Sequence, residues 1–263
     1  MSREMLNDRT WSSEEVRSAF TPGRASMSYG GVAVKTGLFL VVIAILAAVG
    51  LTTSDTFTGR GSGLVYLVGF IVLIGLSIAA VHNPRLALLA GLLYAVLNGL
   101  WIGAISRYYD EVFDGIVGVA LLGTLAVCVG VLLLFSVAGF RVTARGAQII
   151  AVLVVGIGLL YLFGWVFSLV GVDLDFLYGS SPAAIVLGLI ILGVAASTLL
   201  VDLTYVEQGV RAGVPKGAEW YAALGIVSSI VWIYLEVLRL LARLGARNRR
   251  GQQSGRAVPK VAR

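Results

Sequence analysis

The sequence predicts an all-α integral membrane protein, built as one bundle of seven hydrophobic helices. The chain is 58% hydrophobic and only 13% charged, and its mean hydropathy is +0.93. A soluble domain carries about 25% charged residues, so lipid rather than water must cover most of this chain. Its apolar stretches are continuous instead of alternating, which favours helices over a strand barrel.

Seven apolar stretches are each long enough to cross a bilayer as a helix, which takes about 20 residues. Breaker-rich segments separate them, such as Asn83-Pro84-Arg85 after the second stretch and Gly213 to Gly217 before the last. Pro182 opens the sixth stretch, where proline suits a first helical turn. The predicted helices span 32–51, 61–81, 86–106, 115–138, 147–171, 182–204 and 219–241.

Polar segments flank this bundle and predict three parts: a cytoplasmic leader at 1–31, the membrane bundle at 32–244 and a basic flexible tail at 245–263. The leader mixes acidic and basic residues without an apolar core, so it is not a signal peptide. The basic tail indicates contact with anionic lipid headgroups rather than with nucleic acid. The single cysteine, Cys128, excludes a disulfide within the chain and a cysteine-based metal site.

The placement of Lys and Arg predicts a cell-membrane protein with both ends of the chain in the cytoplasm. If every predicted helix crosses the membrane, each side holds 10 basic residues. If both ends are cytoplasmic, the cytoplasmic side holds 18 basic residues and the outer side holds 2. The second arrangement requires an atypical last segment. We therefore expect the helix at 219–241 to be re-entrant or strongly tilted.

Two carboxylates inside apolar stretches are the leading candidates for function: Asp202, after the run from Ile185 to Val201, and Glu236 in the last stretch. A charge at mid-bilayer costs about 2.5–3.5 kcal/mol on insertion scales, so each acid should be protonated, paired or in contact with water. Two close carboxylates share a proton, and their oxygens suit weak calcium binding. Simpler roles stay open: Asp202 reaching water at the membrane boundary, and Glu236 pairing with Arg239 one turn on.

Weaker candidates for an ion pathway are Asn98, Glu207 and Arg85. Asn98 lies inside the third predicted helix, where an interhelical hydrogen bond is its ordinary role, and Glu207 lies just past the sixth, where it can face water. The chain has no metalloprotease motif or phosphate-binding loop, and its one histidine, His82, lies at a segment boundary. We therefore expect neither an enzyme nor a cofactor.

Six segments of the chain match one known pattern: Val201–Val210, Gly213–Pro215, Glu219–Gly225 and Val231–Leu241, with further matches at Met27–Thr36 and Arg141–Thr143. Together they resemble the bacterial branch of the Bax inhibitor-1/YccA family, also called the transmembrane Bax-inhibitor-motif family. The resemblance covers about 27–244. It implies a seven-helix fold with a central last helix, and a pH-sensitive calcium leak gated by an acidic pair in helices six and seven, here Asp202 and Glu236.

Two positions depart from the pattern of this branch. Thr204 stands where a second acid is usual, and Asn98 stands where Glu usually precedes the glycine. The interior is therefore less negative, which makes proton sensing a firmer expectation than calcium conduction. In addition, Asp202 and Glu236 are symmetric about Glu219 rather than about the turn, a mismatch of about 15 Å of helix rise that the intervening chain must absorb if the two are to pair.

Three functions stay open. The first is the cation leak, whose partners are the lipid bilayer, protons and calcium. The second is a non-conducting regulator that binds another membrane protein, such as a protease. The third and weakest is a proton-coupled transporter, because the sequence has no visible inverted repeat.

Overall fold

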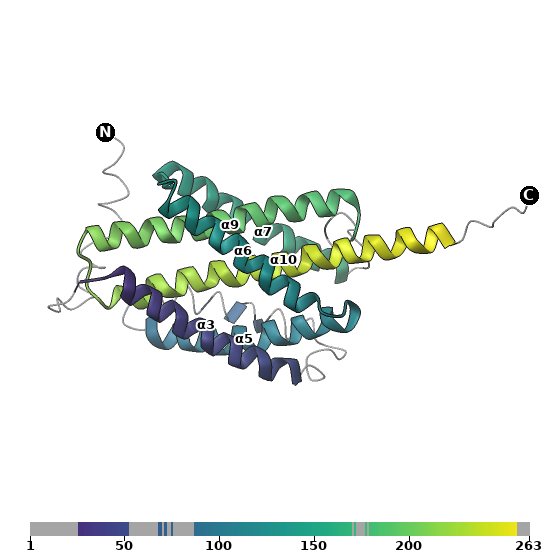
Figure 1. Ribbon diagram of the computed structural model, residues 1–263, viewed down its shortest axis with the longest axis horizontal. Coiled ribbons are helices and arrows are strands. Elements are labelled where there is room, and N and C mark those ends of the chain that lie inside the picture. The colour runs from purple at the N-terminus through teal and green to yellow at the C-terminus, as the bar shows by residue number, and fades with distance from the viewer. Residues whose placement is uncertain are drawn as a thin grey trace, which may run out of the picture.

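The computed structural model describes residues 26–52, 68–69, 71–72, 75, 87–169, 171, 177 and 179–256. All six long helices in these ranges are long and apolar enough to cross a membrane (Figure 1). They are α3 (Tyr29–Thr52), α5 (Ala87–Val112), α6 (Ile116–Ser136), α7 (Ala144–Leu169), α9 (Pro182–Arg211) and α10 (Ala218–Arg256). The prediction of an all-α multi-pass membrane protein is confirmed for this part of the chain. Most of the predicted helix at 61–81 lies outside the described residues.

The helix ends follow from local sequence. Ser181 caps α9 by accepting a hydrogen bond of 3.2 Å from Ala184 N, and Pro182 occupies the first turn as expected. Gly213 adopts a left-handed φ of 65°, which glycine tolerates without strain, and so separates α9 from α10. Beyond the predicted end at 241, α10 continues to Arg256, well into the stretch expected to be a flexible tail.

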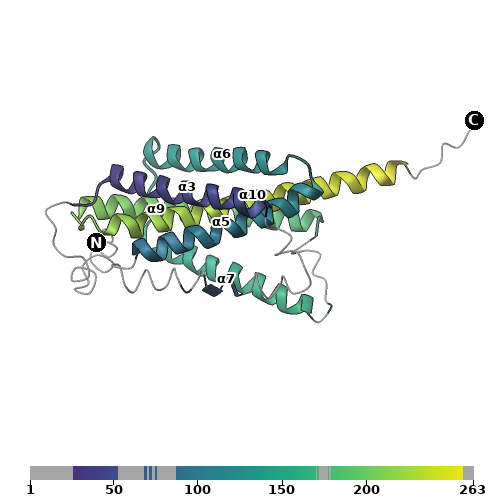
Figure 2. The same cartoon turned by 90° about the horizontal axis from the view of Figure 1, so that it is seen from below.

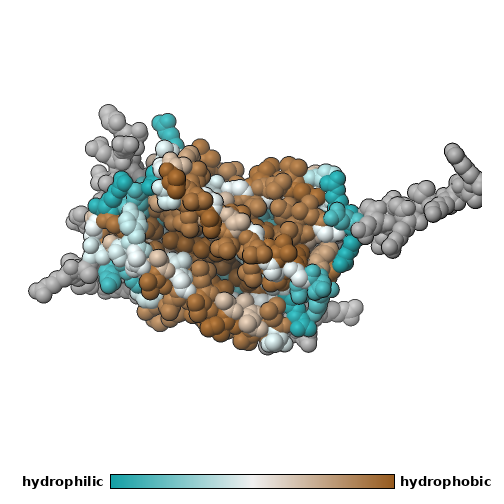
Figure 3. Space-filling model, viewed as in Figure 1, coloured by the Kyte–Doolittle hydropathy of each residue, from teal (hydrophilic) through white to brown (hydrophobic). Residues whose placement is uncertain are grey.

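On the face shown in Figure 3, an apolar belt covers the middle of the bundle between two hydrophilic ends. Large hydrophobic side chains such as Val34, Leu122 and Val152 are strongly exposed. A belt of this kind is what a membrane protein presents to lipid, whereas soluble proteins rarely expose contiguous apolar patches of this extent. The six described helices are therefore embedded in the membrane.

The last helix, α10, is the centre of the bundle. It contacts α3, α5, α6 and α9, and 56% of the residues in its most apolar stretch are buried, against 6% for α7. In the view of Figure 2, α10 lies between α6 on one side and α7 on the other. The prediction of a central last helix is confirmed.

The last segment is not re-entrant, because α10 is one unbroken helix that runs through the whole bundle (Figure 1). It begins beside the start of α3, where Glu219 pairs with Lys35, and further along Arg249 donates to Val112 O at the end of α5. Residue 29 and the C-terminal part of α10 thus lie at opposite ends of the bundle.

The charge count treated every basic residue as a topology signal, although two of these residues are bound inside the bundle. Arg239 is bound to Glu236, and Arg243 is buried and donates to the carbonyls of Leu177 and Ala184. Arginines that are satisfied inside the bundle carry little information about which side of the membrane a loop occupies.

Candidate functional site

Three polar residues on one face of α10 form the framework of the candidate site. Ser229, Glu236 and Arg243 are each seven residues apart, which is close to two helical turns, so their side chains point in similar directions. All three are buried, and Glu236 is 0% exposed. Because buried polar groups in a membrane need internal partners, each of them marks a contact with a neighbouring helix or turn.

The Asp202 cluster, which consists of Asp202, Ser229 and Thr198, joins α9 to α10. Asp202 is half-buried, and its Oδ2 lies 2.5 Å from Ser229 Oγ, which lies 3.0 Å from Thr198 Oγ1. Gly225 allows this approach, because a Cβ at that position would lie 3.1 Å from Asp202 Oδ1. Among the described residues, no Lys or Arg forms an ion pair with Asp202.

Counting protons in this cluster indicates which form of Asp202 fits it. Thr198 Oγ1 lies 2.7 Å from Ala195 O, a carbonyl that can only accept, so the threonine proton is used there. The contact between Thr198 and Ser229 then takes the single serine proton. The remaining contact, between Ser229 and Asp202, needs a proton on the carboxyl group. A protonated Asp202 satisfies the whole chain, whereas an ionised one leaves one contact without a hydrogen.

The Glu236 cluster, which consists of Glu236, Arg239 and Tyr161, joins α10 to α7. Arg239 Nη1 lies 2.6 Å from Glu236 Oε2 and 2.6 Å from Tyr161 Oη. The Tyr161 hydroxyl lies 3.2 Å from Glu236 Oε1, and the Arg239 guanidinium sits over the tyrosine ring at 4.8 Å. The local ion pair considered for Glu236 is therefore present, and a residue of α7 completes it.

The structure does not bring Asp202 and Glu236 together. Ser229 and Glu236 lie about 10 Å apart along α10, and in the described part of the chain no hydrogen bond joins the two carboxylates. The expected pair with a shared proton is therefore absent from this conformation. The two acids lie at different distances from the α9–α10 turn, and that turn is too short to bring them to the same depth.

A third cluster, the Glu219 clasp, holds the start of α3 against the start of α10. Glu219 is 0% exposed and pairs with Lys35, while the backbone nitrogen and hydroxyl of Ser28 donate to its Oε1 at 3.0 and 3.1 Å. Next to it, Met27 N donates to Val214 O at 2.7 Å. The clasp thus ties three segments together at one end of the bundle.

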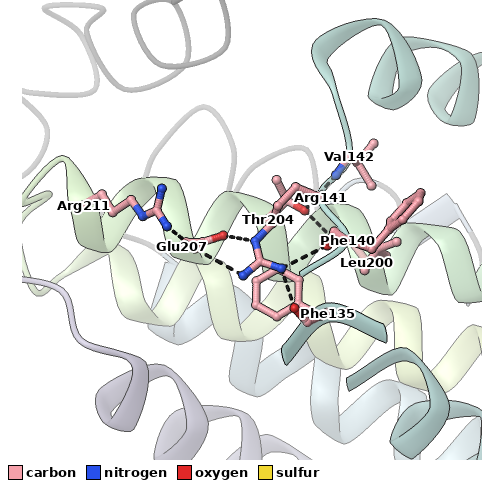
Figure 4. Close-up of polar contacts among 8 residues, drawn as sticks. All are labelled: Phe135, Phe140, Arg141, Val142, Leu200, Thr204, Glu207 and Arg211. Carbon is pink, nitrogen blue, oxygen red and sulfur yellow. Dashed lines mark hydrogen bonds and ion pairs between the residues drawn. The ribbon is translucent and has the colours of Figure 1, made fainter. Parts of the chain in front are cut away.

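Glu207 lies at the same end of the bundle. The sequence allowed it to face water, but in the structure it has protein partners. It is buried and pairs with Arg141 and Arg211, as Figure 4 shows. Arg141 also donates to the carbonyls of Phe135, in the last turn of α6, and of Phe140, in the loop that follows. This contact therefore fixes the loop between α6 and α7 to α9.

The other candidates have structural partners or lie outside the described part. Thr204, at the position where an acid is usual, donates to Leu200 O and accepts from Val142 N, so it serves the same loop contact (Figure 4). Asn98 is buried beside Tyr94, whose hydroxyl also reaches Ser228 of α10. Arg85 lies outside the described residues. In the described ranges, no group of three or more His, Cys, Asp or Glu side chains gathers in a way that could hold a metal ion.

Sequence reasoning missed Ser229, Tyr161 and the Glu219 clasp, although two signals pointed to them. Residues equally far from the turn of a helical hairpin lie at the same depth. Asp202 and Ser229 are equidistant from the point between Pro215 and Lys216, so this geometry selects Ser229 as the partner. Lys35 is the only charged residue in its apolar stretch, and such a charge requires a buried partner. Nothing in the sequence indicates that Tyr161, the one tyrosine of α7, reaches Glu236.

Comparison with known proteins gives one result. A family model described as Bax inhibitor 1 like matches residues 5–246 of the chain. No curated protein and no solved structure matches it.

Proposed function

Because the chain belongs to the Bax inhibitor 1-like family, we propose that it is a pH-sensitive cation leak channel, with calcium among the ions that pass. Asp202 is the proton-binding group, and Glu236 is the second acidic group of the pathway. The two act from separate clusters on α10 rather than as one pair. The protein lies in the cell membrane, with the start of α3 on the cytoplasmic side and the C-terminal part of α10 on the other.

The proton count around Asp202 is the observation that supports this proposal most directly. With a proton on Asp202, the chain of hydroxyl contacts through Ser229 and Thr198 is complete and α9 is held against α10. Loss of that proton leaves a negative charge without an ion-pair partner among the described residues. Such a charge in a membrane attracts water and cations, so the ionised form is the conducting one.

The surroundings of Asp202 are compatible with a proton switch. The titratable side chains on which the charge of Asp202 acts are Tyr205 on α9 and Tyr221 on α10, and phenols are neutral near neutral pH. No described histidine or lysine competes with Asp202 for the proton. The leak is therefore expected to rise as the pH rises, and to lose its pH dependence when Asp202 cannot ionise.

The test is calcium flux into liposomes that contain the purified protein, at mildly acidic, neutral and mildly alkaline pH. Wild type should show more flux at higher pH, and Asp202→Asn should show a low flux at every pH, because an amide donates to Ser229 as a protonated acid does. Glu111→Gln is the matched control, since Glu111 is an exposed acid paired with Arg107. Equal pH dependence in wild type and Asp202→Asn would reject the role of Asp202.

A second function, that of a non-conducting regulator bound to another membrane protein, is supported by the charge balance of the bundle. Glu207, Glu219 and Glu236 are each paired with Lys or Arg, so the interior carries little excess negative charge to attract calcium. The largely exposed helix α7 offers an apolar face for such a partner. Absence of flux at every pH, together with a specific partner recovered by pull-down from membranes, would favour this function over the channel.

A further inference from the structure

Arg239 covers the one fully buried carboxylate in the middle of α10. The Glu236 side chain is 0% exposed, whereas 30% of the Arg239 side chain is exposed, so Arg239 is the more exposed member of the pair. Its Nη1 contacts both Glu236 Oε2 and Tyr161 Oη at 2.6 Å. The carboxylate is thus enclosed by one cation and one phenol, each in direct contact with it.

This arrangement places a positive charge where a passing cation would bind. A buried carboxylate that stays ionised needs a cation beside it, and the guanidinium supplies that cation from within the same helix. Any metal ion that approaches Glu236 has to displace Arg239 from it. The guanidinium also has another contact to keep, because it lies over the Tyr161 ring at 4.8 Å and attraction to the ring does not depend on Glu236.

We propose that Arg239 is a tethered cation that occupies the position of a permeant cation at Glu236 and thereby sets the resting leak and the selectivity of the pathway. The ions excluded in this way are metal cations, both monovalent and divalent. The inference rests on the proposed channel function, to which it adds a residue that determines specificity. When Arg239 leaves Glu236, the carboxylate becomes a cation site, and when it returns the site is blocked.

An ordinary stabilising ion pair at this spacing would give a different result. The two residues are three positions apart on one helix, where opposite charges pair locally and support the helix. If that were the only role, neutralising Arg239 would lower stability without raising flux. The two roles are therefore distinguished by the direction of the change in flux.

The experiment measures calcium and potassium flux into liposomes for wild type, Arg239→Gln, Arg239→Lys and the double variant Glu236→Gln/Arg239→Gln. Arg239→Gln should raise both fluxes several-fold over wild type at equal protein density. Arg239→Lys keeps the charge within reach of Glu236 and should stay close to wild type. The double variant, which has no carboxylate to expose, should fall back to the wild-type level or below it.

Arg247→Gln is the matched control, because it removes one positive charge from an exposed position of the same helix and should leave the flux unchanged. If Arg239→Gln does not fold, Tyr161→Phe keeps both charges and removes only the hydroxyl that contacts them, and it should raise the flux to a smaller extent. A folded Arg239→Gln, or failing that a folded Tyr161→Phe, with wild-type flux would overturn the inference while the channel itself stands. No flux in wild type or in any variant at any pH would instead reject the channel function.

Discussion

Ser229, and not Glu236, is the residue of α10 that faces Asp202, with 2.5 Å between Ser229 Oγ and Asp202 Oδ2. This contact changes the picture of the site from two acids that share a proton to two separate clusters on one central helix. The Asp202 cluster contains no cation, and its hydroxyl chain is complete only with a proton on the acid. The Glu236 cluster contains its own cation.

Ser229→Ala tests the contact between α9 and α10. The substitution removes the hydrogen-bond partner that Asp202 has among the described residues and leaves its carboxyl group unsatisfied, which costs about 1–3 kcal/mol. We expect a lower unfolding temperature in detergent, measured by circular dichroism or by dye binding. Ser197→Ala is the control, because that half-buried serine donates to Gly193 O within its own helix. Equal loss in both variants would mean that Ser229 has no special role.

Breaking the Glu219 clasp should destabilise the end of the bundle that holds it. Removal of one partner from a buried ion pair costs about 3–5 kcal/mol, because the other charge is left buried. Lys35→Met is therefore expected to lower the unfolding temperature strongly, and more so than Arg107→Gln, which opens an exposed pair. Thermal unfolding of the two variants side by side measures the difference.

The same clasp predicts how stability depends on pH. Acid that protonates Glu219 removes its ion pair with Lys35, so stability from the clasp is present near neutral pH and is lost as the pH falls. In Glu219→Gln that part of the acid sensitivity should be absent, although the variant is less stable at neutral pH. Parallel loss of stability with acid in both proteins would show that the clasp contributes nothing to the pH dependence.

The contact between α3 and α5 depends on glycine at Gly103. A Cβ at this position would lie 2.8 Å from Gly50 Cα and would also collide with Ala47 O, so the helices would have to separate. Gly103→Ala is expected to cost about 1–3 kcal/mol of stability, as overpacking does in cores. Gly130→Ala is the matched control, because no atom lies within 4 Å of a Cβ built there. Unfolding in a denaturant series would show a loss in the first variant alone.

The course of α10 through the bundle predicts where its two ends lie. Cysteine placed at Lys216, next to the α9–α10 turn, and cysteine placed at Arg250 should be labelled from opposite sides of the membrane by an impermeant thiol reagent. Both variants require Cys128→Ala as background, since Cys128 is the only native thiol. Labelling of both positions from one side would contradict the arrangement.

Composition and hydropathy were sufficient to predict the class of fold, because lipid imposes long apolar helices on any chain that crosses it. They also identified Asp202 and Glu236, since a charge in an apolar stretch is conspicuous. The same information misplaced the end of α10. The residues after Leu241 are rich in Arg and Gln, which favour a helix as strongly as apolar residues do but do not register as hydrophobic.

The sequence did not determine which side chains of distant helices contact one another. Glu219 has partners 184 and 191 positions away, and Arg141 reaches Glu207 across 66 positions. Such contacts depend on how the helices pack, and packing in lipid is governed by close fit and not by hydropathy. The comparison of distances from the α9–α10 turn was the exception, because it used geometry and made a pairing of Asp202 with Glu236 depend on the chain between them.

The most direct test of the central claim is the pH dependence of calcium flux in liposomes, compared between wild type and Asp202→Asn. If Asp202 holds the closed state through a bound proton, wild-type flux rises with pH, and the flux of Asp202→Asn stays low and nearly constant. A wild-type flux that rises with pH to the same extent in Asp202→Asn, or that falls as the pH rises, would contradict the account.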